Sequence, residues 1–222
     1  MTAFRHLTLR ERIYEEIVRM IVSGELPSGA QIDERALTQR LDVSRTPFRE
    51  AIGTLAKEGL VEIRPYRGYY VRSFSPKEIA DLYDLRITLE CFAVRLAVEN
   101  IDRAGIAELE RLLDECVAAL RRGDMQTYSL RDREFHRTIA RTSGNVALIE
   151  TLERLDMQVQ ICRLVANECP SFPERAAMKR DEILEAFRKR DVKRAEDLMR
   201  AHITEVRSAV VEQMPQEREA PV

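Results

Sequence analysis

The sequence predicts a mainly α-helical protein built from two parts. The first is a winged helix-turn-helix, which is three helices followed by a β-hairpin, and the second is an all-α bundle of about six helices. Three observations predict this fold class. Residues 9–58 show three short helical periodicities, residues 60–74 hold two β-prone runs around a turn, and residues 76–213 show helical periodicity without strand-like alternation. We therefore predict two domains, 1–74 and 75–222.

The N-terminal elements are marked by apolar stripes, caps and a turn. Isoleucine at every fourth position places an apolar face on a helix over residues 9–23. Asp33 is a good N-cap for a short second helix, and Ser44 is a good N-cap for a third helix over residues 45–58. The turn sequence PYRG at residues 65–68, between two β-prone runs, predicts a hairpin.

The third predicted helix has two chemically different faces. A rotation of about 100° per residue separates an apolar side from a side that carries two arginines and a glycine. The apolar side is expected to hold Phe48, Ala51, Ile52 and Leu55, and the other side Arg45, Thr46, Arg49 and Gly53. Such a face suits the major groove, where arginine can bond guanine in a bidentate manner. The alternative is a solvated face on which the arginines pair with Glu34 or Glu50.

The second half of the chain begins with a strong helix start. The run Ser75-Pro76-Lys77-Glu78 has the form of a capping box with proline in the first turn. From there, helical periods are interrupted only by short breaks near glycine, proline, asparagine and aspartate. The predicted helices cover residues 76–99, 103–122, 125–142, 145–167, 173–190 and 192–213.

Composition limits the class of protein. Of 222 residues, 45% are apolar and 33% charged, which is typical of an ordered, water-soluble chain. Apolar runs are too short to span a membrane, and the N-terminus lacks a secretory signal, so we expect a cytoplasmic protein without a membrane partner. The four cysteines form no CxxC pair and are expected to be reduced thiols: Cys91, Cys116, Cys162 and Cys169.

Charge is unevenly divided between the two predicted domains. The net charge is −2, but residues 1–74 hold 12 basic against 10 acidic residues, and residues 75–222 hold 24 against 28. Overall basicity therefore cannot explain DNA binding, and particular arginines must provide the contacts. Besides the third helix, we expect Arg35 on the second helix and Arg67 at the hairpin tip to reach phosphates or the minor groove.

Residues 9–74 resemble the DNA-binding domain of the GntR family of regulators. The resemblance is carried by LPSG, by VSRTPFREAI and by GLV followed by a glycine in the hairpin. It implies that Arg35, Arg45, Thr46 and Arg49 contact DNA, with Gly68 at the tip of the wing. Phe48 stands where the family often has valine, and both are core residues.

Five polar side chains of the second half share helix faces with apolar residues: Arg86, Asp132, His136, Arg180 and His202. Burial of such groups is costly without a partner. Each could be a satisfied core residue, with Arg86, for example, in a salt bridge to Glu90 or Asp132. Their convergence in one bundle instead favours a polar cavity for a metal, an anion or both.

Residues 76–210 resemble the helical effector (FCD) domain of the FadR-type subgroup of the same family. The runs DLYDLRITLE, DREFHRTIA, SGN and MRAHI carry this resemblance. It implies a divalent metal, such as Zn, Ni or Mn, held by Asp132, His136 and His202. Arg180 in RDEILEA replaces the family's remaining histidine ligand. A guanidinium stays protonated and repels cations, although three ligands could still hold zinc with an open position. We expect Arg180 to bind the carboxylate of an organic acid, directly or alongside a weakened metal site, with Arg86 and Asn145 as further effector contacts.

Together these patterns predict a ligand-responsive transcription regulator that binds an inverted-repeat operator as a homodimer. We expect it to be a repressor. Its effector would be a small organic acid, a divalent metal or both. Two other classes remain open at this point. One is a metal-dependent hydrolase using Asp132, His136 and His202, for which no general base can be assigned. The other is a DNA-bridging protein whose polar core groups all pair internally.

Overall fold

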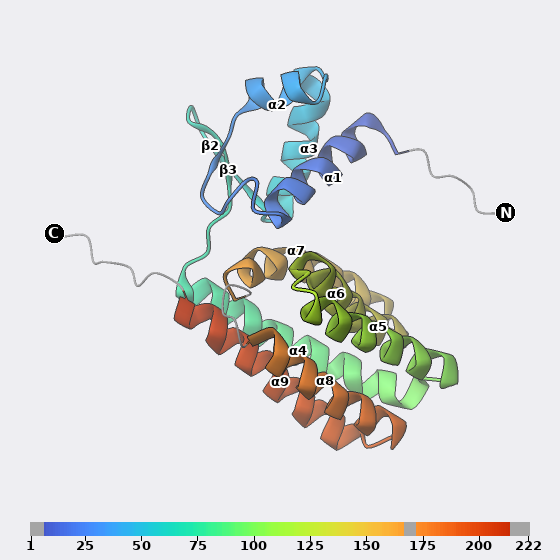
Figure 1. Cartoon of the computed structure of the whole chain (residues 1–222). Helices are drawn as coiled ribbons and strands as arrows, with labels where there is room; N and C mark the ends of the chain where they lie inside the picture. The colour runs from blue at the N-terminus through green and yellow to red at the C-terminus, as the bar shows by residue number, and fades with distance from the viewer. Residues whose placement is uncertain (1–6, 167–171, 214–222) are drawn as a thin grey trace. The chain divides into compact units, whose positions relative to one another are not determined.

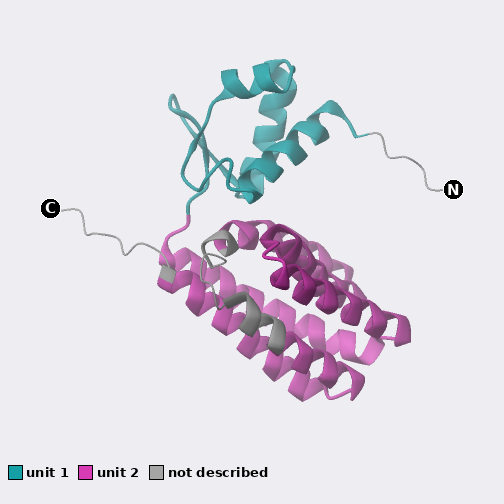
Figure 2. Cartoon of the chain, viewed as in Figure 1, with its two compact units in different colours: residues 1–73 teal, residues 74–222 magenta. Residues whose placement is uncertain are grey.

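A computed structural model describes residues 7–166 and 172–213 of the chain (Figure 1). Its contacts divide the chain into two compact units, residues 1–73 and residues 74–222, shown in different colours in Figure 2. The first contains the helix-turn-helix and a small sheet, and the second is entirely helical in its described part. The predicted mainly α fold class, with a winged helix-turn-helix followed by a helical bundle, is confirmed.

The first unit has three helices and three short strands: α1 (Leu9–Val22), β1 (Gln31–Ile32), α2 (Glu34–Arg40), α3 (Arg45–Lys57), β2 (Val61–Arg64) and β3 (Gly68–Val71). The strands form an antiparallel sheet in the order β1-β3-β2. The sequence predicted the β2–β3 hairpin but not β1. Two residues are too few to show a strand periodicity, and β1 exists only because β3 offers it backbone partners.

The helices of this unit begin where their caps require. Thr8 forms a capping box with Glu11 at the start of α1, and Asp33 accepts a hydrogen bond from Ala36 N at the start of α2. Ser44 is extended at the start of α3 but makes no side-chain cap bond. The apolar face of α3 is fully buried as predicted, with Phe48, Ala51, Ile52 and Leu55 at 0% exposure.

The second unit contains six helices in its described part: α4 (Pro76–Asn100), α5 (Arg103–Arg121), α6 (Met125–Thr142), α7 (Val146–Ala166), α8 (Phe172–Arg188) and α9 (Val192–Gln213). The long helix α4 packs against α6, α7 and α9, and α5 packs against α6 and α8 (Figure 1). The capping box of Ser75 and Glu78 forms as predicted. Because α4 contacts three other helices, its inward side chains reach the centre of the bundle.

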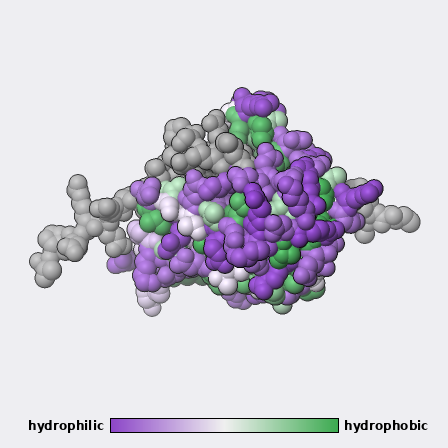
Figure 3. Space-filling view, turned by 90° about the horizontal axis from the view of Figure 1, so that it is seen from below, coloured by the Kyte–Doolittle hydropathy of each residue, from purple (hydrophilic) through white to green (hydrophobic). Residues whose placement is uncertain are grey.

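The core of the bundle is apolar apart from a central group of polar residues. Cys91, Cys116 and Cys162 are buried and form no disulfide with one another, and burial raises the pKa of the Cys91 thiol. Cys169 lies outside the described residues. None of the described helices has the length and apolarity that crossing a membrane would need. The face in Figure 3 is mainly hydrophilic, with apolar residues in small separate patches.

Candidate functional site

The exposed face of α3 carries the residues expected to read DNA. Arg45, Thr46 and Arg49 are all exposed and lie in the first half of the helix. Gly53 is one turn further along, and a Cβ added there would meet nothing within 4 Å. The helix therefore presents two flexible cations and a position without a side chain on one side. A helix of this kind can approach the edges of bases closely.

Glu34 on α2 holds the two arginines of α3. It accepts hydrogen bonds from Arg49 Nε at 3.1 and 3.3 Å, and its Oε1 lies 3.0 Å from Arg49 Nη2 and 3.8 Å from Arg45 Nε. These bonds raise the pKa of Arg49, which stays charged. The alternative considered from the sequence was a solvated face on which the arginines pair with Glu34 or Glu50. The pairing with Glu34 occurs, yet 57% of the Arg49 side chain remains exposed. Glu34 thus orients the guanidinium without covering it.

The other predicted DNA contacts lie around the wing. Arg35 and Gly68 line one shallow hollow together with part of β1, and Arg67 is exposed at the turn between β2 and β3. Gly68 has φ = +102°, a conformation that side chains rarely adopt, which explains why the turn needs glycine there. Tyr66, two residues earlier and also at positive φ, is the most exposed large hydrophobic residue described. Sequence reasoning did not single out Tyr66.

In the helical unit, three of the predicted polar residues meet at one point. Asp132 and His136 lie one turn apart on α6, and His202 lies on α9. Each offers a ligand atom within 4.8 Å of the other two, and all three side chains are buried. The rings of His136 and His202 stack with centroids 5.4 Å apart. This spacing could hold a divalent ion.

A second layer of polar residues supports His136 from α4. His136 Nδ1 donates a hydrogen bond to Glu90 Oε2 at 2.5 Å, and Arg86 Nε donates to Glu90 Oε1 at 2.6 Å. Burial raises the pKa of Glu90, but the charge of Arg86 and the contact with His136 outweigh it and hold the pKa at about 2. Glu90 is therefore a carboxylate that fixes which ring nitrogen of His136 carries the proton. The salt bridge between Arg86 and Glu90 is one of the two considered from the sequence.

Arg180 completes the cluster from α8. Its side chain is 0% exposed; Nη1 forms an ion pair with Asp132 Oδ1, and Nη2 donates a hydrogen bond to the Tyr128 hydroxyl at 3.1 Å. The guanidinium also lies 5.4 Å from the centroid of the Tyr128 ring. A permanent cation thus contacts one of the three potential metal ligands. The donor atoms fit a divalent ion in their spacing, but the charge beside Asp132 does not.

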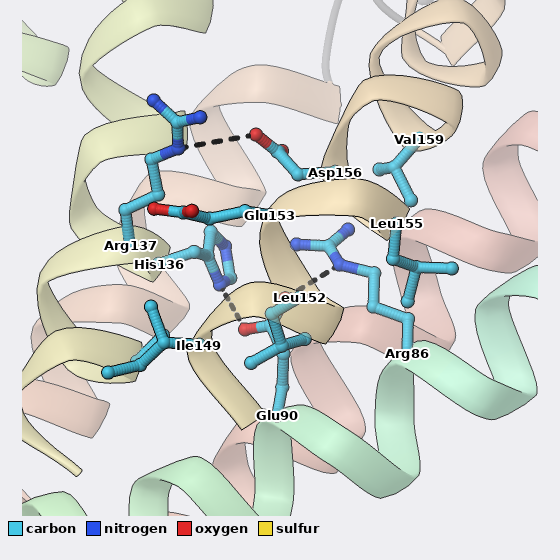
Figure 4. Close-up of a pocket in the computed structure, with 11 residues that line it drawn as sticks. Arg86, Glu90, His136, Arg137, Ile149, Leu152, Glu153, Leu155, Asp156 and Val159 are labelled. Atoms are coloured by element: carbon cyan, nitrogen blue, oxygen red, sulfur yellow. Dashed lines mark hydrogen bonds and ion pairs between the residues drawn. The ribbon is translucent and has the colours of Figure 1, made fainter. Parts of the chain in front are cut away.

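A small pocket opens beside His136 (Figure 4). Charged groups enter it from α4 and α6, and α7 contributes both apolar side chains and two carboxylates: Ile149, Leu152, Leu155, Val159, Glu153 and Asp156. Its room for water is about 30 Å³, enough for one or two molecules. Arg86 is 5% exposed, and its Nη1 has no hydrogen-bond partner among the described residues.

The three predicted effector residues do not share one pocket. Arg86 lines the pocket, whereas Arg180 does not and is bound to Asp132. Asn145 caps α7, since its Oδ1 accepts a hydrogen bond from Leu148 N at 3.1 Å, and it does not line the pocket either. Tyr128 was missed from the sequence as a member of the cluster. Its position one turn before Asp132 on the same helix is the signal that could have found it.

Comparisons with known proteins agree with a DNA-binding domain followed by a helical domain. Residues 9–71 match the model for "Bacterial regulatory proteins, gntR family", and residues 81–205 match the model for the FCD domain. The chain is 30% identical over 202 residues to the HTH-type transcriptional repressor RspR of Escherichia coli (strain K12), covering 91% of this chain and 89% of that protein. It is 28% identical over 197 residues to a probable D-xylose utilization operon transcriptional repressor of Paenarthrobacter nicotinovorans, covering 88% and 86%.

Solved structures share the fold. The structure of E. coli McbR/YncC superposes with a TM-score of 0.83 at 23% identity and covers 93% of this chain and 99% of that one. A structure described as the metal-free FCD domain of TM0439 covers 64% of this chain and 96% of its own, with a TM-score of 0.54 and 19% identity.

Proposed function

Because the chain belongs to the GntR family of bacterial regulators and carries an FCD domain, we propose that it is a homodimeric repressor controlled by a small organic acid. The family makes the chain a DNA-binding transcription regulator and not an enzyme, which removes the hydrolase alternative. Two of the similar proteins are themselves called repressors. Repression and control by an organic acid are the parts that go beyond the family.

The observation that carries the effector proposal is the environment of Arg86. Its guanidinium is buried, contacts Glu90 through Nε, and has an Nη1 without a hydrogen-bond partner in the described part of the chain. A buried donor of this kind favours an anionic acceptor. Helix α7 offers apolar side chains such as Leu152 and Ile149 for the rest of the molecule. It also brings the carboxylates of Glu153 and Asp156 to the pocket, of which Asp156 is paired with Arg133 and Arg137. A carboxylate with a short hydrocarbon body matches both sides, so the effector role falls to Arg86 in preference to Arg180.

The size of the pocket suggests how binding is signalled. With room for only one or two water molecules, the pocket has to widen before an organic acid enters. Helix α7 provides one wall and packs against α4, α6 and α9. A ligand that binds only the widened form shifts the population of helix packings. In a dimer, such a shift changes the spacing of the two recognition helices and hence the operator affinity.

An apolar stripe on α4 supports a homodimer. Leu85 and Phe92 are 49% and 38% exposed, and the half-buried Leu89 and Leu96 continue the same face. Their spacing of four, three and four residues is that of a helix seam that packs against another helix. We therefore expect a second copy of this chain on the stripe. Two copies would present two α3 helices to an inverted-repeat duplex.

The test of the effector role combines stability with DNA binding. The full-length protein is heated with a panel of short-chain carboxylic acids and the matching uncharged amides, and its binding to a duplex selected from a random library is measured with each. We expect at least one acid, and not its amide, to raise the unfolding temperature and weaken duplex binding. A ligand at 100 times its Kd adds about 2.7 kcal/mol to the stability.

Two variants make the result specific to Arg86. Arg86→Gln and Arg86→Lys should lose the response to the acid, since neither offers the guanidinium fork. Lys77→Gln is the matched control, because Lys77 is a cation on the same helix but lies in an exposed pair with Asp81. An equal response in the Arg86 variants, or no response to any acid, contradicts the proposal.

A further inference from the structure

The cluster of Asp132, His136 and His202 already contains a cation. Arg180 lies in direct contact with Asp132, its side chain is 0% exposed, and Asp132 is 3% exposed. The guanidinium reaches this place from α8, while its partners Asp132 and Tyr128 lie on α6. One positive charge therefore ties two helices together at a point where three potential metal ligands converge.

We infer that Arg180 is the resident cation of this cluster and excludes a divalent metal from it. Three facts support this. A guanidinium stays protonated in proteins, so the charge cannot be removed by loss of a proton. Among the described residues, Asp132 is the carboxylate that pairs with Arg180. A divalent metal on Asp132 would bring two cations together in a buried site, where repulsion is screened far less than in water.

The Arg180 guanidinium is enclosed by the protein and cannot leave the site without breaking its ion pair. Its side chain has no solvent exposure, and its other hydrogen-bond acceptor among the described residues is the Tyr128 hydroxyl, which is not a carboxylate. Breaking the pair with Asp132 would leave a buried cation without its counter-ion, which is strongly unfavourable. Metal binding is therefore opposed twice, by repulsion and by the lost ion pair.

The remaining parts of a metal site are nevertheless in place. Glu90 fixes the orientation of His136, as a carboxylate often does for a metal-bound histidine. Asp132, His136 and His202 supply three ligand atoms at short range. Removing the guanidinium and adding an imidazole at position 180 should therefore create a four-ligand site without any other change.

The experiment measures metal content and unfolding temperature, so its outcome does not depend on any effector. Full-length protein without a polyhistidine tag is purified without chelator, weighed by native mass spectrometry and titrated with Zn²⁺. We expect the wild type to carry no stoichiometric ion and to show no rise in unfolding temperature with Zn²⁺ or fall with chelator. Arg180→His should bind one ion per subunit, with a Kd at least ~100-fold lower than any wild-type binding.

Controls assign the ion to the cluster. Adding His202→Asn to Arg180→His should abolish the gain, whereas zinc bound elsewhere would persist. If Arg180→His does not fold alone, refolding in the presence of Zn²⁺ supplies the missing cation, and a zinc-dependent recovery supports the inference. One divalent ion per wild-type subunit would overturn it. So would an Arg180→His protein that folds and binds no ion, because the guanidinium would then not be the cause of exclusion.

Discussion

At the scale of single residues, Glu34 decides how the arginines of α3 are presented. It bonds Arg49 through both carboxylate oxygens and also approaches Arg45, while the Arg49 side chain stays 57% exposed. An acidic residue near DNA is repelled by the phosphates, so its presence needs a compensating role. Holding a guanidinium in one orientation before it meets a base is such a role, because less side-chain entropy is then lost on binding.

This role predicts a loss of discrimination in Glu34→Gln. Binding to the selected duplex should weaken by about 1 kcal/mol, or roughly fivefold, while binding to an unrelated duplex stays equal or strengthens. Titrations of both duplexes at one fixed salt concentration measure the ratio. Glu16→Gln is the matched control, since it also removes one negative charge from the first unit by breaking an exposed pair with Arg19. An unchanged ratio in Glu34→Gln would show that Glu34 is a bystander.

At the scale of elements, α3 combines a fully buried face with a face that carries no bulk at Gly53. A glycine inside a helix lowers its stability relative to alanine, so this position works against folding. The space around Gly53 is open, whereas a Cβ added to Gly105 in α5 would lie 2.7 Å from Ile101 Cγ1. Packing therefore explains Gly105 but not Gly53. We therefore propose that Gly53 allows α3 to approach DNA closely.

Gly53→Ala should separate stability from DNA binding. We expect the free energy of unfolding to rise by about 0.5–1 kcal/mol from helix propensity, and the affinity for the selected duplex to fall because a methyl group now faces the groove. Urea denaturation and duplex titration measure the two quantities. Gly105→Ala is the contrasting variant, expected to lower stability and to leave DNA binding unchanged. Tighter binding by Gly53→Ala would contradict a groove-facing position.

At the scale of the whole molecule, the apolar stripe of α4 and the two-fold symmetry of an inverted repeat make one prediction. Leu85→Glu combined with Phe92→Glu places charges on the expected contact between copies, where burial of unpaired charge is costly. We expect the wild type to sediment as a dimer and the variant as a folded monomer. The variant should bind a single half-site as well as the wild type does but lose the tighter binding to two half-sites.

The control for the dimer prediction carries a charge on a different helix. Leu130→Glu changes another exposed leucine, 48% accessible on α6, and should leave the dimer intact. A dimeric Leu85→Glu, Phe92→Glu protein would place the interface on a different face. Insertion of about five base pairs between half-sites should also abolish dimer binding, because it moves the second half-site to the opposite side of the duplex.

The sequence alone determined the fold class and most element boundaries. Caps such as Asp33 and Ser75 mark where helices start, and the apolar face of α3 appears in its spacing. These signals are local, since they depend on residues within one or two turns of each other. The same locality explains why the two-residue strand β1 was missed: its hydrogen bonds come from β3, far along the chain.

Only the tertiary structure decided which polar residues meet. The sequence predicted that Asp132 and His136 lie close together, because they are one turn apart on one helix. It could not show that Arg180 pairs with Asp132, that Glu90 holds His136, or that Arg86 alone among the predicted effector residues lines the pocket. Helical periodicity fixes the face on which a side chain lies, but the facing partner depends on how α4, α6, α8 and α9 pack. The division between an internal cation and an effector pocket is therefore a property of the packing.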